Sequence, residues 1–404
     1  PGSRIALPRH LKAERPKNPL SNSELALLAH LLGDGCTVPR QPIHYTSADE
    51  ENVQIVERAA SRLFNIDPRR VRQKNWWHVY LPSPYRLTHG KHNPITQWLV
   101  DLGIGLRHAW NKFIPDAVFS CDQFKIRFFL HHLWATDGNI SWKRLKGRKP
   151  SAAIYYATTS SRLASDVQQL LLRIGIHSTL RVAASEDYRD THQVHIQGKE
   201  SQVRFLETVG SAGQRGRIVP ELLRALAQFR TNPNTDTIPK ASWRGLITAE
   251  KERVGMTWRQ IHAGIDTAYS GSSLFKSGLS RARMARVAKV LGSESLQDLA
   301  ESDVFWDEIA SIEPRGMEDV YDATVPGVHN FLASDLFVHN SIEQDADVVI
   351  FIYREVVGEE EAEPANVADV IVAKHRNGPT GQLQLVFLKD RAQFVSAELR
   401  RVTA

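Results

Sequence analysis

The sequence has 404 residues, enough for two or three domains, and its 42% hydrophobic content supports ordinary globular cores. No apolar run approaches the length that crosses a bilayer and the start lacks a signal-peptide pattern, so we expect no membrane partner. Two cysteines, Cys36 and Cys121, do not make a disulfide framework, so we expect a reducing, cytoplasmic location.

The net charge of +6 is unevenly distributed along the chain. Residues 341–404 contain seven Lys or Arg and eleven Asp or Glu, a net of −4, which leaves +10 for the first 340 residues. A basic body on an acidic tail favours a body that meets nucleic acid, because phosphates attract clustered cations.

Two segments of the body share one pattern. Residues 25–35 read LALLAHLLGDG and residues 129–138 read FLHHLWATDG, and each is an apolar run of helical length that ends in Asp-Gly. Small residues near the end of each run let two helices approach closely, so Asp34 and Asp137 would project together from the bottom of the pair. A strand-like and a helical run follow each copy, at residues 43–48 and 53–64 and again at 153–158 and 161–174. This repetition predicts an internal duplication of α/β halves.

This arrangement resembles the LAGLIDADG homing endonucleases, specifically the intein-borne kind with two copies in one chain. The resemblance implies pseudo-two-fold αββαββα halves over residues 21–230, double-stranded DNA as substrate, and Asp34 and Asp137 as metal-binding acids. Close carboxylates repel each other, and divalent cations such as Mg²⁺ relieve that repulsion and activate water for phosphodiester hydrolysis. Lys112, in the run NKFIP, matches a lysine that the family carries between its motifs and would polarise the water or the phosphate.

Other interpretations of this region stay open. Asp-Gly is a common turn at helix ends, and homing nucleases often decay, so a non-cleaving DNA-binding remnant is the alternative to an active enzyme. The second motif departs from the usual pattern at His131, His132 and Trp134. Adjacent positions of a helix point in different directions, so we interpret the two histidines as packing or surface residues rather than metal ligands.

Basic runs supply candidate DNA-facing surfaces. Residues 69–77 read RRVRQKNWW, and residues 143–149, directly after the second motif, read KRLKGRK. Residues 180–196 form a further strand region rich in basic and aromatic residues. These cations would grip the phosphate backbone, while a solvated loop is the alternative for each run.

Residues 245–300 predict a small helical module. Short helices are expected at 257–263, 272–276 and 280–291, separated by tight Gly or Ser turns. The pattern is similar to a helix-turn-helix DNA-binding module, which would line Arg281, Arg283 and Arg286 along one helix near the groove. A helical linker bundle without a ligand is the alternative.

Residues 320–341 read VYDATVPGVHNFLASDLFVHNS and end in a tripeptide that can cut its own backbone. The side-chain amide of Asn340 can attack its own carbonyl carbon, closing a succinimide and breaking the bond to Ser341. His339 would protonate the departing amine, and the hydroxyl of Ser341 would take over an acyl group from upstream. A second His-Asn pair begins at His329. An ordinary strand-turn-strand is the alternative.

This pattern closely resembles the C-terminal splicing motifs of inteins. The resemblance implies a β-rich Hint splicing remnant made of residues 1–20 and 301–340. A splicing intein needs a Cys or Ser at its first residue and an upstream Thr-x-x-His motif, whereas this chain begins PGSRIALPR. We therefore expect an N-terminally truncated fragment that needs a missing upstream helicase and intein segment in order to splice.

Residues 341–404 have the character of a different protein. Strands are expected at 348–353, 367–373 and 382–388. The runs EQDAD and KHRNGPTG resemble the last part of the RecA-like domain of bacterial DnaB-type replicative helicases. That family forms hexamers in which Lys374 and Arg376 would reach the ATP of the neighbouring subunit, where a planar arginine stabilises the γ-phosphate.

The alternative for the KHRNG run is a hairpin turn with basic flanks. No G-x-x-x-x-G-K-[ST] loop is present in the sequence, so we expect no ATP hydrolysis from this chain alone. The predicted fold class is therefore a multidomain α/β and α+β protein: endonuclease, helical module, Hint remnant and partial RecA-like tail.

Overall fold

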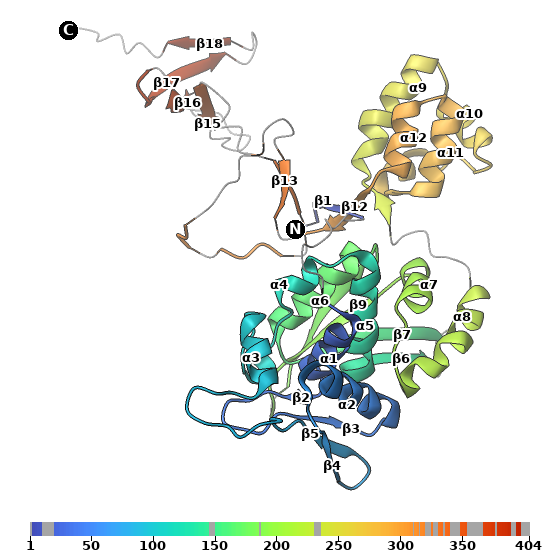
Figure 1. Cartoon of the computed structure of the whole chain (residues 1–404). Coiled ribbons are helices and arrows are strands. Elements are labelled where there is room, and N and C mark those ends of the chain that lie inside the picture. Colours follow the sequence, from blue (N-terminus) through green and yellow to red (C-terminus); the bar gives the residue numbers. More distant parts are fainter. Residues whose placement is uncertain are drawn as a thin grey trace. The chain divides into compact units, whose positions relative to one another are not determined.

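The structure is a computed structural model that divides into two compact units, Pro1–Ser311 and Ile312–Ala404 (Figure 1). The described residues are 2–9, 20–144, 150–185, 187–229, 236–309, 311–314, 316–319, 325, 330–333, 336–339, 348–353, 367–375, 378–388 and 393–396. Within these residues, no helix combines the length and apolarity that spanning a membrane requires.

Two helices, α1 (Asn22–Leu32) and α5 (Gln123–Asp137), lie side by side at the centre of the first unit (Figure 1). Ser21 starts α1 with a capping box, and Asp122 caps α5. Every residue from Leu25 to Leu32 is buried, because this helix is packed on nearly all sides. The helices predicted at the two Asp-Gly motifs are confirmed, and each begins several residues earlier than its apolar run.

Each central helix leads into a four-stranded antiparallel sheet. The first sheet has the order β2 (Gly35–Cys36), β3 (His44–Ser47), β5 (Trp77–Tyr80), β4 (Arg69–Arg72). The second has the equivalent order β6 (Gly138–Lys143), β7 (Ser151–Thr158), β9 (Thr191–Ile196), β8 (Ser178–Ala183). Gly35 pairs with Tyr45 and Gly138 pairs with Tyr156, so each acidic turn enters its sheet at the same place. The predicted duplication is present in the fold.

Amphipathic helices cover the sheets. They are α2 (Glu50–Phe64), α3 (Pro94–Asp101), α4 (Asp116–Phe119), α6 (Ser161–Arg173), α7 (Lys199–Thr208) and α8 (Val219–Ala227). In α2 the buried apolar residues are Val53, Val56, Ala59 and Ala60, the spacing of one helical face. One hydrophobic core runs from Leu20 to Leu226 and holds both halves together.

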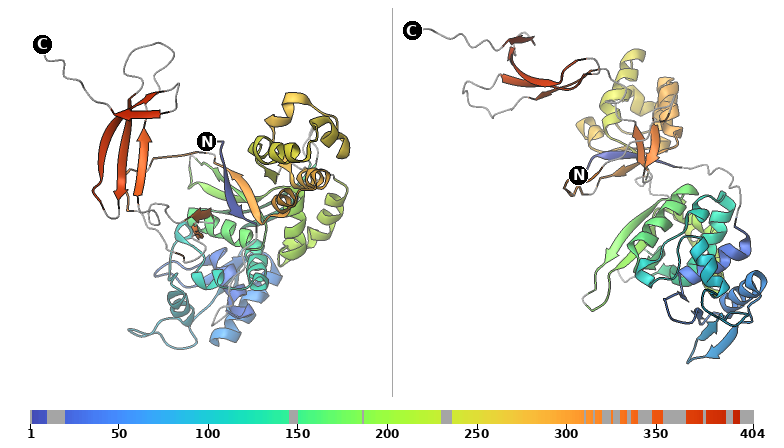
Figure 2. Two further views of the ribbon diagram at one scale, coloured as in Figure 1. Left: turned by 90° about the horizontal axis from the view of Figure 1, so that it is seen from above. Right: turned by 60° about the vertical axis from the view of Figure 1, so that its left-hand side comes forward.

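A second hydrophobic core lies in a helical module (Figure 2). Its elements are η3 (Trp243–Ile247), α9 (Thr248–Val254), α10 (Trp258–Gly264), η4 (Gly271–Lys276), α11 (Arg281–Leu291) and α12 (Glu294–Glu301), with a short pair of strands, β10 (Thr237–Ile238) and β11 (Leu279–Ser280). Trp243, Ile261, Met284 and Leu296 fill this core. The helices predicted at 257–263 and 280–291 are confirmed, and the short helix predicted at 272–276 is the 3₁₀ turn η4.

The beginning of the chain pairs with residues some three hundred positions later. β1 (Arg4–Pro8) is antiparallel to β12 (Val304–Glu308), and Arg4 forms an ion pair with Glu308 at 3.3 Å. Both strands belong to the segments in which the sequence predicts a splicing remnant.

The second unit contains only strands among its described elements. A hairpin joins β13 (Asn330–Ala333) and β14 (Leu336–His339), and a sheet has the order β15 (Val348–Tyr353), β16 (Val367–His375), β17 (Gly381–Leu388), β18 (Gln393–Ser396). The three strands predicted in the tail are confirmed and β18 is additional. On β15 the alternating residues Val348, Ile350 and Ile352 are exposed, so this strand presents an apolar face.

Candidate active site

The central helices α1 and α5 approach each other closely at Gly33, where no side chain separates the backbone of Gly33 from Thr136. A β-carbon at that position would lie 2.0 Å from Oγ1 and 2.3 Å from Cβ of Thr136, well inside van der Waals contact. Because both helices end at this contact, it brings the following residues, Asp34 and Asp137, to one place at the base of the pair.

The two acids influence each other electrostatically. Burial, followed by the negative charge of Asp137, raises the pKa of Asp34 to about 7. Desolvation also raises the pKa of Asp137, although the outer side of that residue is open to solvent. Lys112 and Arg215 oppose both shifts. A cation between the carboxylates would relieve a repulsion that the protein only partly compensates.

Lys112 is inserted beneath the end of α1. The residue is only 4% exposed, and its Nζ donates to the carbonyl oxygens of Leu31 at 2.9 Å, Gly35 at 2.7 Å and Gly33 at 3.3 Å. Burial lowers the pKa of Lys112 to about 8, while the two acids act in the opposite direction. The ammonium group therefore satisfies helix-terminal carbonyls and faces the acidic pair at the same time.

Arg215 is the counterpart of Lys112 in the second half, and sequence reasoning missed it. Its Nη1 donates to the carbonyl oxygens of Trp134, at 2.9 Å, and Thr136. The separation of 103 residues that relates Asp34 to Asp137 also relates Lys112 to Arg215. Applying that offset to Lys112 would have found it, but the substitution of Arg for Lys concealed the repeat.

A cavity of about 600 Å³ opens beside Asp34. Its lining residues are Asp34, Thr46, Ser47, Ala48, Asp49, Asn52, Trp76, Ala135, Thr136, Gln214 and Arg215. Oδ1 of Asn52 is buried there without a hydrogen-bond partner. The cavity is thus lined by two acids, Asp34 and Asp49, and by one guanidinium, that of Arg215.

The residues of the site fit a hard divalent cation. Within the part of the chain that the structure describes, no cluster of three or more His, Cys, Asp or Glu could hold a metal. Two carboxylates are nevertheless an ordinary protein contribution for Mg²⁺, which keeps several waters and takes further oxygens from a phosphate. Asp34 and Asp137 would hold it.

The histidines of the central helices pack within the interface. Nε2 of His30 lies 3.3 Å from Nδ1 of His132, and Nδ1 of His30 lies 3.0 Å from the hydroxyl of Tyr45. Burial lowers the pKa of both histidines to about 3, so both are neutral near pH 7. Nδ1 of His131 lies 2.7 Å from the carbonyl of Val209. These contacts agree with the prediction that His131 and His132 are packing or surface residues, His132 being buried and His131 half-buried.

The basic run at residues 69–77 is partly used for internal structure. Arg70 forms ion pairs with Glu57 at 2.5 Å and Glu50 at 2.6 Å, whereas Arg72 lies over the ring of Trp77 at 4.7 Å. Exposed Arg69, Arg72 and Lys74 are therefore the cations of this run that are available to DNA. Of the second run, residues 145–149 lie outside the described residues.

The helical module also differs from the expectation for its arginines. Arg281 forms an ion pair with Asp236 at 2.9 Å and donates to the carbonyls of Ala300 and Ser302. The half-buried Arg283 lies 5.5 Å from the ring of Trp243. The guanidinium of Arg281 is therefore occupied by contacts within the protein, and the prediction that it lies near a DNA groove was wrong.

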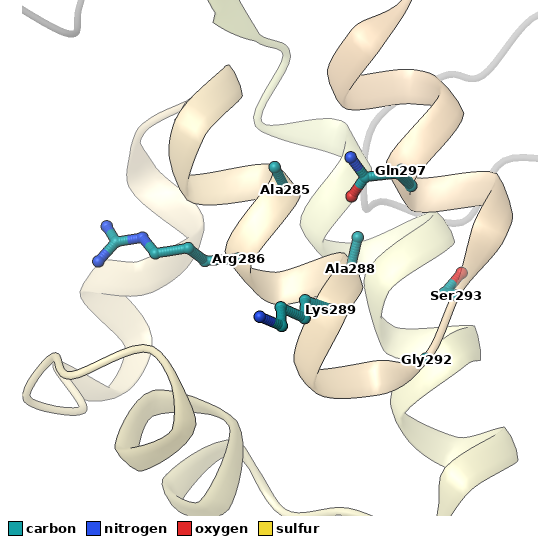
Figure 3. Close-up of a pocket in the computed structure, with 7 residues that line it drawn as sticks. All are labelled: Ala285, Arg286, Ala288, Lys289, Gly292, Ser293 and Gln297. Carbon is teal, nitrogen blue, oxygen red and sulfur yellow. The ribbon is translucent and has the colours of Figure 1, made fainter.

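Arg286 is the exposed arginine of that predicted set. With Lys289 it borders a shallow cavity of about 470 Å³ between α11 and α12, whose floor is formed by Ala285 and Ala288 (Figure 3). Arg286 and Lys289 extend from α11 on the same side of this cavity, which makes them the cationic edge of the module.

The predicted splicing and nucleotide residues are only partly described. In the β13–β14 hairpin Asn330 pairs with His339, so the described residue of each His-Asn pair lies opposite that of the other. Lys374 lies on β16, opposite Val349. The remaining predicted residues, His329, Asn340, Ser341 and Arg376, lie outside the described residues.

Comparison with known proteins separates two regions. The LAGLIDADG-like domain family matches residues 125–210, which include the second acidic motif, and the DnaB-like helicase C terminal domain family matches residues 277–396. Among solved structures, I-DmoI in complex with DNA and Mn covers 46% of this chain and 96% of its own, with 12% identity and a TM-score of 0.32.

The replicative DNA helicase DnaB of Rhodothermus marinus is 45% identical over 404 residues, 98% of this chain and 42% of the helicase. That of Synechocystis sp. is 42% identical over 399 residues, 98% of this chain and 45% of the helicase. The chain thus spans less than half the length of these relatives. It combines a LAGLIDADG-like domain with a DnaB-like helicase C-terminal region, a combination that fits an intein-containing DnaB helicase.

Proposed function

We propose that residues 21–230 form a site-specific endonuclease that cuts both strands of DNA with Mg²⁺ held by Asp34 and Asp137. The observation that carries this proposal is the convergence of two acids and two cations at the ends of one close-packed helix pair. Each half contributes one acid and one cation from equivalent positions, which suits two scissile phosphates on opposite strands.

Each side chain has a defined part in phosphodiester hydrolysis. Asp34 and Asp137 would hold a divalent cation, which when bound would supply an activated water and neutralise charge on the phosphate. Lys112 keeps a positive charge against the acids from a site sealed from solvent. Arg215 lies at the edge of the cavity, where its planar cation would contact a phosphate oxygen.

Cleavage of a defined DNA tests this proposal. The substrate is a plasmid carrying the helicase-gene sequence uninterrupted at the insertion point, and the control plasmid carries the interrupted gene. We expect linearisation of the first plasmid only, dependent on Mg²⁺ and abolished by a chelator. Specific binding without cutting would instead favour the decayed, non-cleaving DNA-binding protein.

The helical module offers a second DNA contact at the cationic edge formed by Arg286 and Lys289. Arg286→Ala with Lys289→Ala should weaken DNA binding by about tenfold at moderate salt and reduce the salt slope, because two phosphate contacts are lost. Arg281→Ala should instead lower the melting temperature, because it removes one of the two ion pairs of Asp236, whose other partner is Arg9, and leaves several carbonyls unpaired. Equal loss of binding in a folded Arg281→Ala protein would contradict this assignment.

We also propose that Asn340 cyclises to release the chain after it. Its side-chain nitrogen forms a bond to its own carbonyl carbon, the Asn340–Ser341 amide bond breaks, and His339 gives a proton to the departing amine. The pairing of Asn330 with His339 supports this, because it would place His329 near the reacting bond.

Long incubation of the purified chain should produce a fragment that begins at Ser341 and that Asn340→Ala lacks. Mass spectrometry distinguishes the succinimide-ended partner from a product of ordinary proteolysis. A fragment of the same mass from both variants would exclude cyclisation. Supplying the upstream intein segment would extend the test to splicing, in which Ser341 accepts the acyl group.

We propose that the tail belongs to the C-terminal domain of a helicase that hydrolyses ATP as a hexamer. The match of the DnaB-like helicase C terminal domain family to residues 277–396, which include most of the tail, supports this proposal. In the assembled ring, Lys374 and Arg376 would reach the nucleotide of the adjacent subunit.

A further inference from the structure

The two segments that carry Lys112 and Arg215 are each held by a helix of the opposite half. In the first half, the Oγ of Ser160, the N-cap of α6, donates to the carbonyl of Lys112 at 2.6 Å. Two residues later, the amide of Ile114 donates to Oδ2 of Asp166 at 2.8 Å, again on α6. Helix α6 belongs to the second half, so the backbone around Lys112 is fixed across the pseudo-symmetry.

The reciprocal contact holds the segment that carries Arg215. The amide of Gln214 donates to Oδ2 of Asp49, the N-cap of α2 in the first half, at 2.6 Å. A β-carbon on Gly213 would lie only 2.3 Å from the same oxygen, so the chain runs directly against the cap. Arg217 then forms an ion pair with Glu51 of α2.

Both cap residues therefore do two things at once. Asp49 accepts from the amide of Glu51 through Oδ1, at 3.0 Å, and from Gln214 through Oδ2. Ser160 accepts from the amide of Leu163, at 3.1 Å, and donates to Lys112. The charged ends of Lys112 and Arg215, in contrast, contact the helix of their own half.

We propose that Asp49 and Ser160 are positioning residues. Asp49 fixes the position of Arg215 and Ser160 fixes that of Lys112, in each case from the opposite half of the fold. This inference rests on the proposed endonuclease function. The backbone of each cation segment is anchored by one half and its side chain by the other, so the loss of one cap displaces one cation and leaves the second in place. The consequence is a strand-specific defect rather than a general one.

Asp49→Asn isolates the tether at Gln214. Asparagine is as good an N-cap as aspartate and keeps one oxygen for Glu51, but its amide group cannot accept from Gln214. We expect one strand to be cut about tenfold more slowly, because a displacement of the order of an ångström has effects of this size or larger. The other strand should change less than about twofold, so nicked plasmid accumulates.

Ser160→Asp provides the mirror experiment. A carboxylate still accepts from Leu163 but cannot donate to the carbonyl of Lys112, so the opposite strand should be the slow one. Ser160→Thr keeps both roles and should cut normally. Asp122→Asn is the matched control, because Asp122 caps α5 through Lys125 without holding a cation segment.

Strand rates are measured on DNA labelled at both ends. Unequal, opposite defects support the proposal, whereas equal slowing of both strands with a lower melting temperature overturns it, as do unchanged rates in both variants. If wild type cuts nothing, the endonuclease proposal fails, and amide hydrogen exchange tests the hydrogen bond from Gln214 to Asp49 independently of cleavage. The amide of Gln214 should exchange faster in Asp49→Asn than in wild type, and should be unchanged in Ser160→Asp. An unchanged exchange rate in Asp49→Asn would exclude the role proposed for this hydrogen bond.

Discussion

Asp34→Asn and Asp137→Asn should each slow DNA cleavage by about 10²–10³-fold, because each removes a charge from the pair that holds the cation. Asparagine preserves volume, so DNA binding measured in Ca²⁺ or without metal should change little. The rates are compared in Mg²⁺ with Asp101→Asn, an exposed aspartate on α3. Retention of wild-type cutting by either acid variant would remove that residue from the catalytic site.

The raised pKa of Asp34 predicts how the cleavage reaction depends on pH. With a pKa of about 7, Asp34 is largely protonated at pH 6 and ionised at pH 8. Since a cation competes with that proton, the Mg²⁺ concentration needed for half-maximal cleavage should fall as pH rises across this range. A metal requirement independent of pH would show that Asp34 does not bind the ion.

The same pKa has a consequence for stability. A folded-state pKa above the unfolded value of 3.8 means that metal-free protein loses stability as pH rises from about 4 to 7. Asp34→Asn avoids this loss and should be more stable than wild type at pH 8 by on the order of 1–2 kcal/mol. Thermal unfolding in a chelator measures the difference, which should shrink toward pH 4.

Gly33→Ala should destabilise the endonuclease region by about 3 kcal/mol, because the added methyl overlaps Thr136 in a fully packed helix interface. One of the atoms that it meets, Cβ of Thr136 at 2.3 Å, is bonded directly to the backbone, so a rotamer change of Thr136 does not relieve the overlap. Cleavage should fall as well, since separating the helices separates the acids. Chemical denaturation and cleavage rates measure the two effects.

Two variants make this result specific. Gly245→Ala is the matched control, because a β-carbon there meets nothing within 4 Å and alanine favours helix by about 1 kcal/mol. Thr136→Gly should restore part of the stability lost in Gly33→Ala by exchanging the small residue between the helices. Wild-type stability in Gly33→Ala would mean that the helices do not approach as closely as the structure shows.

The repeated Asp-Gly motifs made the central pair and the acids predictable, because an apolar run of helical length and a following turn are local features. Lys112 was singled out through the resemblance of its run, NKFIP, to the endonuclease family. Arg215 was missed, since its flanking sequence differs and only the contact with Trp134 and Thr136 reveals its equivalence to Lys112. The prediction for Arg281 was wrong because its position in a helical run does not reveal that this face of the helix is turned toward Asp236.

The helix-ending acids, the duplicated order of elements and the prediction of a different character after Asn340 all follow from short-range composition and spacing along the chain. Which cation lies beside which central helix, and the holding of the cation segments by α2 and α6 across the pseudo-symmetry, are visible in the fold alone. These contacts join residues far apart in the chain, such as Asp49 and Gln214. Their partners are selected by packing geometry, which no local pattern encodes.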